Sequence, residues 1–428
     1  MIRLALLATL LLLVPGPAKA GESDAEVLAQ IDWQGHPAMH IPWSFFRPGL
    51  TDRTPPLSFR HQFKQVVYAP YLDQSGVRIF LMAAMAAEQA RNPRQARALI
   101  LRQLRYVEAF VSEHGDRYAM ASTPAEARAI LRDTDKMVVI HSIEGGHHLL
   151  SDPGDAAFWG EQGVALVTLI HLRDDELGGA AVLPQAVGPL INPRGTKRER
   201  RGERRGLTQL GKDAIVALDA AGILVDLSHM TRASIDDALT VTAAHGIAPV
   251  VTHGRLATLR ATEFGLLDAQ IVELYRQGGM LSLGLDGAHL DPIEPTRPVP
   301  ADLCLGTLES FAFHTQAVRD LVAANAATIL GEQGDPASAR TRLAVGWSSD
   351  WNGWVSHSAP VYGPGRCRDL DALQARGEPL EIDTRGLAHP GLLPQHWERL
   401  ERDGLDLDPM LHAAERFLQL WEQARTHP

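Results

Sequence analysis

Five side chains that could bind metal ions or carry protons lie at the ends of separate apolar runs. They belong to Glu144, His171, His229, His253 and Asp350. Imidazole and carboxylate ligands without thiolate suit Zn, Mn, Fe, Ni or Co. A carboxylate such as Glu144 can bridge two cations, which together acidify a water molecule and polarise a carbonyl group. The residue types therefore favour metal-dependent hydrolysis, provided that the fold brings them together.

A single histidine at the end of a buried strand is more often a hydrogen-bonded core residue than a metal ligand. Five such residues at five strand ends are harder to explain by packing, since burying several ionisable groups together is costly unless something pairs them. Histidines in expected loops or helices are interpreted as ordinary polar residues; examples are His61, His114, His245, His314 and His396.

The apolar runs have the character of strands that are buried on both faces. Each is short, rich in Val, Ile or Leu, and lacks regular polar alternation, as in a parallel sheet covered by helices. The expected strands span residues 77–85, 136–143, 164–172, 223–229, 248–253, 279–285 and 343–349, with an eighth near 31–41. Amphipathic helices are expected at 86–113, 208–221, 234–245, 267–277 and 410–425.

This alternation predicts an α/β fold. A closed (β/α)8 TIM barrel is favoured over a doubly wound open sheet, because polar residues recur at the C-terminal ends of many strands. An open sheet would concentrate its chemistry at one switch point instead. In a closed barrel the strand ends form a ring at one face, so all five polar residues could converge on a single pocket.

The first twenty residues have the pattern of a secretory signal peptide. Arg3 gives a positive start, residues 4–14 are almost entirely Leu and Ala, and Ala18-Lys19-Ala20 matches a small-residue cleavage site. The apolar run is too short for a permanent membrane anchor. We therefore expect an exported protein, periplasmic or secreted, with one barrel domain over 21–428 and long loops at about 173–206 and 351–394.

The net charge of −10 argues against a nucleic-acid partner. Residues 194–205, by contrast, are strongly basic and contain seven Arg or Lys side chains. A solvated loop is favoured for this segment over a role in attracting anionic ligands. The two cysteines, Cys304 and Cys367, could form a disulfide in an oxidising compartment.

Several short motifs occur in a fixed order along the chain. They are Ile143-Glu144-Gly145-Gly146-His147, Leu169-Ile170-His171, Gly206-Leu207-Thr208, Gly222 through His229, Pro249 through His253, and Val345 through Gly353. With these motifs the sequence resembles the membrane dipeptidase (renal dipeptidase) family of metallopeptidases, a branch of the amidohydrolase-like (metallo-dependent hydrolase) barrels. The similarity runs from about residue 60 to the end, and the order of the motifs is more specific than any one of them.

The resemblance implies roles for the five residues. Glu144 would bridge two metal ions, and His229 and His253 would bind the second of them. His171 would stabilise the oxyanion, and Asp350 would accept and return the proton. The implied cofactor is zinc, two ions per chain, or Mn or another divalent metal. The implied activity is hydrolysis of dipeptides by a metal-bound hydroxide, with a dipeptide or another small molecule as the substrate. From the net charge and the short apolar run we expect neither a nucleic-acid partner nor a stable membrane anchor, and a homodimer stays open.

Two parts of the family pattern are missing. The family's first strand carries a His-x-Asp pair for the first metal, whereas this region reads Gly35-His36-Pro37-Ala38-Met39-His40. His36 and His40 are the candidate replacements, together or singly, so one metal or two stays open. The family's substrate-carboxylate arginine has no match at the expected offset, and Arg255 and Arg260 are the nearby candidates. Three hypotheses follow: a dipeptidase, a related amidohydrolase or lactonase with another substrate, and a non-catalytic binding protein on the same barrel.

Overall fold

The computed structural model describes residues 30–41, 69–85, 90–183, 188–286, 290–331, 336–353 and 355–427. The expected signal peptide lies outside these residues. The strands are β1 (Gln30–Gly35), β2 (Val77–Met85), β3 (Tyr118–Met120), β4 (Met137–Glu144), β5 (Val164–Thr168), β6 (Leu224–Asp226), β7 (Val250–Gly254), β8 (Met280–Gly284) and β9 (Gly346–Ser348).

Helices follow most of the strands. Those between β1 and β8 are α1 (Ala69–Leu72), α2 (Pro93–Glu113), α3 (Pro124–Asp133), α4 (Pro153–Glu161), α5 (Gly188–Ile191), α6 (Pro193–Glu199), α7 (Gln209–Ala220), α8 (Arg232–His245) and α9 (Asp268–Arg276). Later helices are α11 (Leu308–Ala324), α12 (Ala326–Leu330), α13 (Pro336–Arg342), α14 (Leu370–Gln374), α15 (Glu381–Arg385), the 3-10 helix η2 (Pro390–Leu392), α16 (Leu393–Arg402), α17 (Asp408–Leu411) and α18 (Ala413–Thr426). The regions expected as long loops thus contain short helices.

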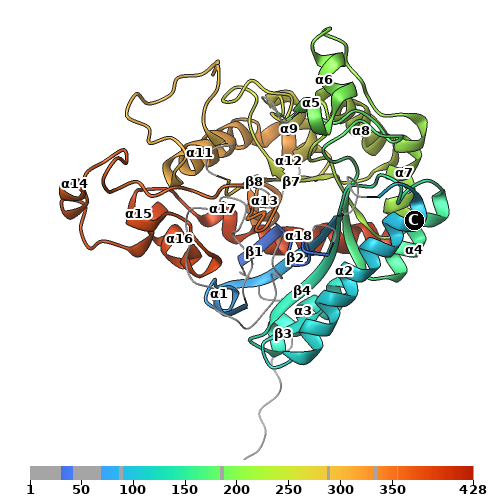
Figure 1. The fold of residues 1–428 in the computed structure, drawn as a ribbon, viewed down its shortest axis with the longest axis horizontal. Helices are drawn as coiled ribbons and strands as arrows, with labels where there is room; N and C mark the ends of the chain where they lie inside the picture. The colour runs from blue at the N-terminus through green and yellow to red at the C-terminus, as the bar shows by residue number, and fades with distance from the viewer. Residues whose placement is uncertain are drawn as a thin grey trace, which may run out of the picture.

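The strands form a parallel barrel with the order β1-β2-β4-β5-β6-β7-β8-β9 (Figure 1). The segment after β9 returns to β1 and nearly closes it: the Asp350 N–H donates to the Gln34 carbonyl, and the His36 N–H donates to the Trp351 carbonyl, both at 2.8 Å. The prediction of a (β/α)8 barrel is confirmed. The short strand β3 was not predicted, and it pairs with the start of β4 off the barrel path.

The register of the sheet brings the strand ends to one level. Met85 pairs with Glu144, Glu144 with Thr168, and Thr168 with Asp226. Each of these residues ends its strand, so the C-terminal ends of β2, β4, β5 and β6 lie side by side. The face at which parallel strands end is the face where barrel enzymes build their sites.

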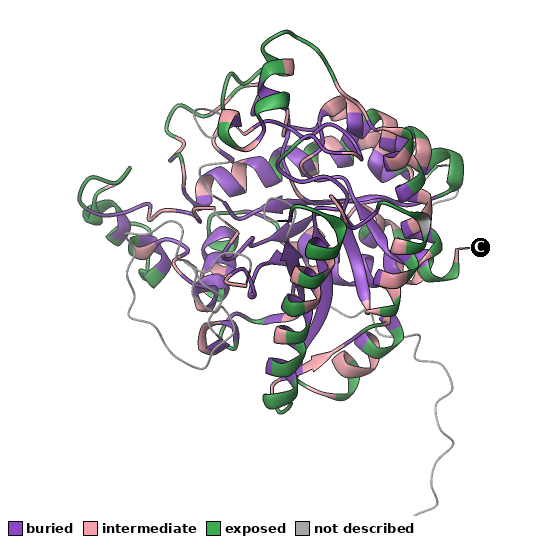
Figure 2. Cartoon of the chain, turned by 45° about the vertical axis from the view of Figure 1, so that its right-hand side comes forward, coloured by how far each residue is buried: buried purple, intermediate pink, exposed green. Residues whose placement is uncertain are grey.

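Burial follows from the sequence pattern of each element. All eight residues of β4 are buried, and Figure 2 shows the strands as a buried interior with helices whose outer faces are exposed. In α2, Ala96, Ile100, Leu104 and Val107 are buried and recur at the three- and four-residue spacing of a helix that rests on a core. This helix begins where the Asn92 side chain accepts a hydrogen bond from the Gln95 N–H, which satisfies an otherwise free donor.

A disulfide and the C-terminal helix hold parts of the chain outside the barrel strands in place. Cys304 and Cys367 form a disulfide with a Cα–Cα distance of 5.7 Å, which confirms that expectation. The C-terminal helix α18 packs on the barrel, and its Phe417 ring meets the Trp33 ring of β1 edge-to-face at 5.0 Å. In the described part of the chain, no helix combines the length and the apolar character needed to cross a membrane.

Candidate metal centre

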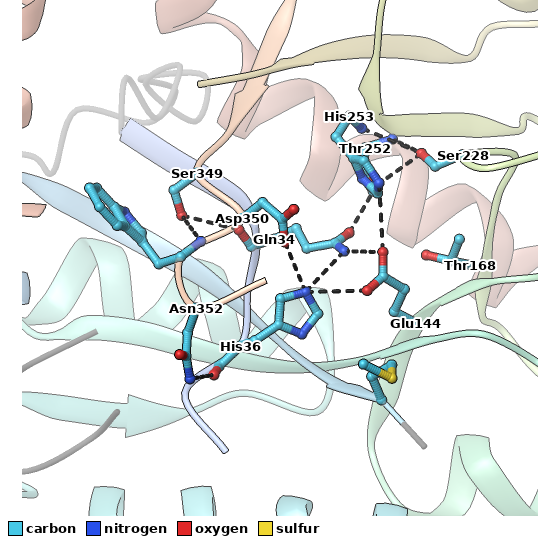
Figure 3. A network of polar contacts seen from close by, with 12 residues as sticks. Gln34, His36, Glu144, Thr168, Ser228, Thr252, His253, Ser349, Asp350 and Asn352 are labelled. Carbon is cyan, nitrogen blue, oxygen red and sulfur yellow. Dashed lines mark hydrogen bonds and ion pairs between the residues drawn. The ribbon is translucent and has the colours of Figure 1, made fainter. Parts of the chain in front are cut away.

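Glu144 is the centre of a cluster of polar side chains at the strand ends (Figure 3). It is the last residue of β4 and only 4% exposed. Its Oε1 lies 3.1 Å from His229 Nε2 and 3.6 Å from His253 Nε2. Its Oε2 lies 3.2 Å from His36 Nε2 and 3.5 Å from His171 Nε2. Residues from five separate strand ends therefore meet at one carboxylate.

His229 and His253 make the closest pair of nitrogens in the cluster. Their Nε2 atoms are 2.6 Å apart. Two unprotonated nitrogens repel at that distance, so the contact requires a proton on one of them or a positive charge that faces both. The backbone at His229 has a φ of 64°, a conformation that non-glycine residues rarely adopt and that often marks a functional position.

His253 is oriented by a buried hydrogen-bond network behind it. Its Nδ1 lies 2.8 Å from the Thr252 hydroxyl, and that hydroxyl lies 2.8 Å from the Asp226 carboxylate. Asp226 is fully buried and also accepts hydrogen bonds from Thr168 and Ser228. With Nδ1 donating to the hydroxyl, Nε2 of His253 presents its lone pair to the cluster, as metal-binding histidines do.

His36 and Asp350 form the other half of the cluster. His36 Nε2 lies 3.0 Å from Asp350 Oδ1. The same nitrogen therefore contacts both the Glu144 carboxylate at the end of β4 and the Asp350 carboxylate after β9. Asp350 also has a positive φ, 52°. Its neighbour Ser349 donates its N–H to Asp32 Oδ1 at 2.8 Å, and burial raises the pKa of Asp32 to about 7 despite the hydrogen bonds from Ser349.

The electrostatics leave two histidines neutral and Glu144 charged. Burial lowers the pKa of His229 and of His253, and the neighbouring histidine charges lower them further. Burial alone would raise the pKa of Glu144, but His171, His229 and His36 outweigh it and lower that pKa well below its usual range. Neutral imidazoles and an ionised carboxylate are the protonation states that metal ligands require. The donor set around Glu144 Oε1 therefore fits a divalent cation such as zinc.

The charge on His36 is set by its partners. Burial would lower the pKa of His36, yet the interactions with Asp350 and Glu144 raise it to about 10. Burial raises the pKa of Asp350, and the charge of Glu144 adds to that effect against the ion pair with His36. The structure thus pairs a basic imidazole with a carboxyl group that is less acidic than usual.

The structure brings together most of the residues that the sequence singled out. His36, Glu144, His171, His229, His253 and Asp350 all belong to the cluster. His40 does not join them, because the chain turns at residues 37–41 and the His40 ring packs edge-to-face on Tyr106 of α2. Of the two candidate histidines of the first strand region, His36 belongs to the cluster and His40 does not.

The two candidate arginines lie at different places. Arg255 is 8% exposed, and its guanidinium lies 3.8 Å from the Asp286 carboxylate. Its charge interacts with Asp350 as well as Asp286. Arg260 donates to the Asp291 carbonyl at 2.8 Å, which ties it to the segment after β8. Of the two, Arg255 is the one whose charge reaches the cluster.

Gln34 is a member of the cluster that sequence reasoning missed. Its Nε2 donates to Glu144 Oε1 at 2.6 Å, and its Oε1 lies 3.0 Å from the Thr252 hydroxyl. Side chains two residues apart on a strand share one face, so the pairing of Gln34 with His36 was available from the sequence. Of the residues near the end of β1, Gln34 and His36 contact the Glu144 carboxylate, whereas Ala38 is buried in the turn that follows.

The comparisons with known sequences agree on one family of dipeptidases. The profile described as membrane dipeptidase (peptidase family M19) matches residues 40–330. Dipeptidase ataJ from Aspergillus terreus is 26% identical over 187 residues, which cover 42% of this chain and 44% of that protein. An uncharacterized dipeptidase, C965.12, from Schizosaccharomyces pombe is 26% identical over 184 residues, covering 43% of this chain and 40% of that protein. The matched region thus spans less than half the length of each curated relative.

Solved structures share the fold along nearly the whole chain. A dipeptidase AC, described as a metallopeptidase of family M19, superposes with a TM-score of 0.62 at 16% identity and covers 93% of this chain and 99% of that one. A metallopeptidase from Rhodobacter sphaeroides, liganded with a phosphinate mimic of the dipeptide L-Ala-D-Ala, gives the same TM-score and identity, with 92% and 99% covered. At this identity the likeness establishes the barrel fold.

Proposed function

This chain belongs to the membrane dipeptidase family (peptidase family M19), and on that basis we propose that it is a metal-dependent dipeptidase. The observation that carries the proposal is the convergence of His229, His253 and other strand-end residues on the Glu144 carboxylate. Divalent cations bound there would polarise the scissile carbonyl and lower the pKa of a water molecule. Zinc suits the His and Glu donors best.

The side chains around Glu144 supply the remaining chemistry. Asp350 would accept a proton from the attacking water and deliver it to the leaving amine, because its carboxylate faces the cluster and its pKa is raised towards the range of a general base. His171 would donate a hydrogen bond to the developing oxyanion. Its ring packs edge-to-face on that of His229 at 4.5 Å, which holds the imidazole beside the ligands.

Arg255 is proposed to bind the carboxylate of the substrate. A guanidinium is planar, matches the geometry of a carboxylate, and is itself charged at physiological pH. The 3.8 Å separation from Asp286 leaves the ion pair loose, so a substrate carboxylate can form shorter hydrogen bonds with the same group. We also propose export, supported by the signal-peptide pattern of residues 1–20, and a single barrel domain over the remainder.

The substrate class is tested by a panel of compounds. The protein, reconstituted with Zn²⁺ or Mn²⁺, is assayed against L,L- and L,D-dipeptides, N-acyl amino acids and lactones. We expect amine release from dipeptides to exceed turnover of the other classes, and chelation to abolish it. Turnover of a lactone or an N-acyl amino acid in place of dipeptides would assign a different substrate to the same site, and no turnover of any compound would favour a binding protein.

Gln34 offers a test of how many metal ions the site holds. Its amide donates to Glu144 Oε1 at 2.6 Å and lies 3.4 Å from His36 Nε2, so a side chain that is a poor metal ligand occupies the His36 side. We expect Gln34→His to increase bound zinc per chain, because an imidazole there adds a metal ligand beside His36 and Glu144. Gln34→Asn, which keeps an amide, is the matched control. Equal zinc content in the wild type and Gln34→His, measured by plasma mass spectrometry, would contradict this account of the His36 side.

A further inference from the structure

A second group of metal-binding side chains lies beside the barrel mouth, outside the Glu144 cluster. It consists of His147 and His148, on the segment after β4, and Glu176, on the segment after β5. Their side chains are 12%, 24% and 31% exposed. One ligand atom from each lies within 4.8 Å of the other two. From this geometry we propose that His147, His148 and Glu176 bind a second, separate divalent transition metal.

The two imidazoles face the same carboxylate from one side. His147 Nδ1 lies 2.5 Å from Glu176 Oε2, and His148 Nδ1 lies 3.7 Å from Glu176 Oε1. The rings stack with their centroids 3.8 Å apart and an angle of 28° between their planes. Both Nδ1 atoms therefore point towards the two oxygens of one glutamate, which is the arrangement of a three-ligand site.

The backbone takes an unfavourable conformation to produce this arrangement. Successive side chains of an extended segment point to opposite sides, which would separate the two rings. His148 instead has a φ of 62°, a region that few non-glycine residues occupy and that costs free energy. The same turn lets the His148 N–H donate to Glu176 Oε1 at 2.7 Å, so the carboxylate is already held in place.

A simple ion pair between His147 and Glu176 explains only part of this geometry. Such a pair needs only the His147 imidazole. The His148 ring nevertheless stacks on it and points its Nδ1 at Glu176 Oε1 from 3.7 Å, which is too far for a hydrogen bond. Two positive imidazoles stacked at this distance would repel each other. One cation bound by both imidazoles and by Glu176 accounts for the orientation of both rings.

The ligand types indicate which metal fits. Two imidazoles and one carboxylate suit Zn²⁺, Co²⁺ or Ni²⁺ rather than Mg²⁺ or Ca²⁺. Partial exposure leaves room for a water molecule as a further ligand. The metal would join the segment that follows Glu144 to the segment that begins the 173–206 region. The Glu176 carbonyl already accepts a hydrogen bond from the Thr208 hydroxyl at 2.6 Å, so the metal would tie both segments to the start of α7.

The test measures zinc binding in a full-length background without the central site. Glu144→Gln combined with His253→Ala removes two central ligands and leaves the second group intact. We expect this background to bind about one equivalent of Zn²⁺ in calorimetric titration with ZnCl2, and Co²⁺ to give visible absorption bands. Added Glu176→Gln or His148→Asn should weaken that binding by about tenfold or more, since even outer-shell changes at metal sites cost about 10–100-fold. Asparagine tolerates the positive φ at position 148.

His114→Asn, a change in a partly exposed histidine of another segment, serves as the matched control and should leave zinc binding unchanged. Urea unfolding without metal checks that every variant is folded. The inference is wrong if the background binds no zinc, or if His148→Asn binds it as tightly as the background while His147 and Glu176 remain. Neither result bears on dipeptide hydrolysis, because the central site is absent from all of these variants.

Discussion

Replacing Glu144 with glutamine is expected to remove metal from the central cluster and to lower kcat/KM by about 10³-fold or more. The Glu144 carboxylate contacts His36, His171, His229 and His253 through its two oxygens. Glutamine keeps the size but loses the charge that attracts a cation and the second oxygen that can bridge. Metal ions contribute several kcal/mol of charge stabilisation in the transition state, and each 1.36 kcal/mol is a factor of ten in rate.

The measurement is zinc content by plasma mass spectrometry alongside dipeptide turnover. Glu113→Gln, an exposed glutamate at the end of α2, is the matched control and should change neither quantity. If Glu144→Gln retains the zinc content and turnover of the wild type, the Glu144 cluster is not the metal site, and the proposed function loses the observation that carries it.

The second large effect is expected for Asp350→Asn. This variant should keep its metal, because Glu144, His229 and His253 remain, while kcat falls by about 10²–10⁴-fold, the usual contribution of a positioned proton carrier. Asparagine is compatible with the φ of 52° at this position. The substitution therefore removes a proton acceptor with little disturbance of the backbone.

The pH profile separates this role from a structural one. A general base must be ionised, so activity should fall as the pH drops through the pKa of Asp350. Burial raises that pKa above its ordinary value, and the acid limb of kcat/KM should lie above the pKa of about 3.9 of an exposed aspartate. In Asp350→Asn the limb should be lost or moved, whereas Asp320→Asn, on the exposed side of α11, should preserve it. An unchanged acid limb in Asp350→Asn would remove Asp350 from proton transfer.

The barrel could be predicted from the sequence because its strands are long apolar runs with polar ends. Val77–Met85 matches β2 residue for residue, and the expected run 136–143 differs from β4 by one residue at each end. The expected runs 164–172 and 223–229 extend past β5 and β6, because their last apolar residues continue into buried segments beyond the paired strand. β3 was missed because its three residues lie in a short apolar stretch between Arg117 and Ser122. β6 and β9 also have three residues, but they lie within longer apolar runs.

The cluster was predictable to the extent that each of its candidate residues ends an apolar run of its own. Glu144, His171, His229, His253 and Asp350 were found in this way. His36 and His40 could not be separated by residue type, because only the turn at 37–41 decides which imidazole faces inward. Gln34 was missed because an amide rarely signals a metal site, and its role depends on contacts with Glu144 and Thr252 from distant strands.

The central claim is that strand ends far apart in the chain form one metal site at Glu144. Crystals of the zinc-loaded protein, measured at the zinc absorption edge, test it most directly. We predict an anomalous peak within about 2.0–2.2 Å of a Glu144 oxygen and of the Nε2 atoms of His229 and His253. A fully loaded crystal with no peak inside that coordination distance of these three residues would contradict the claim.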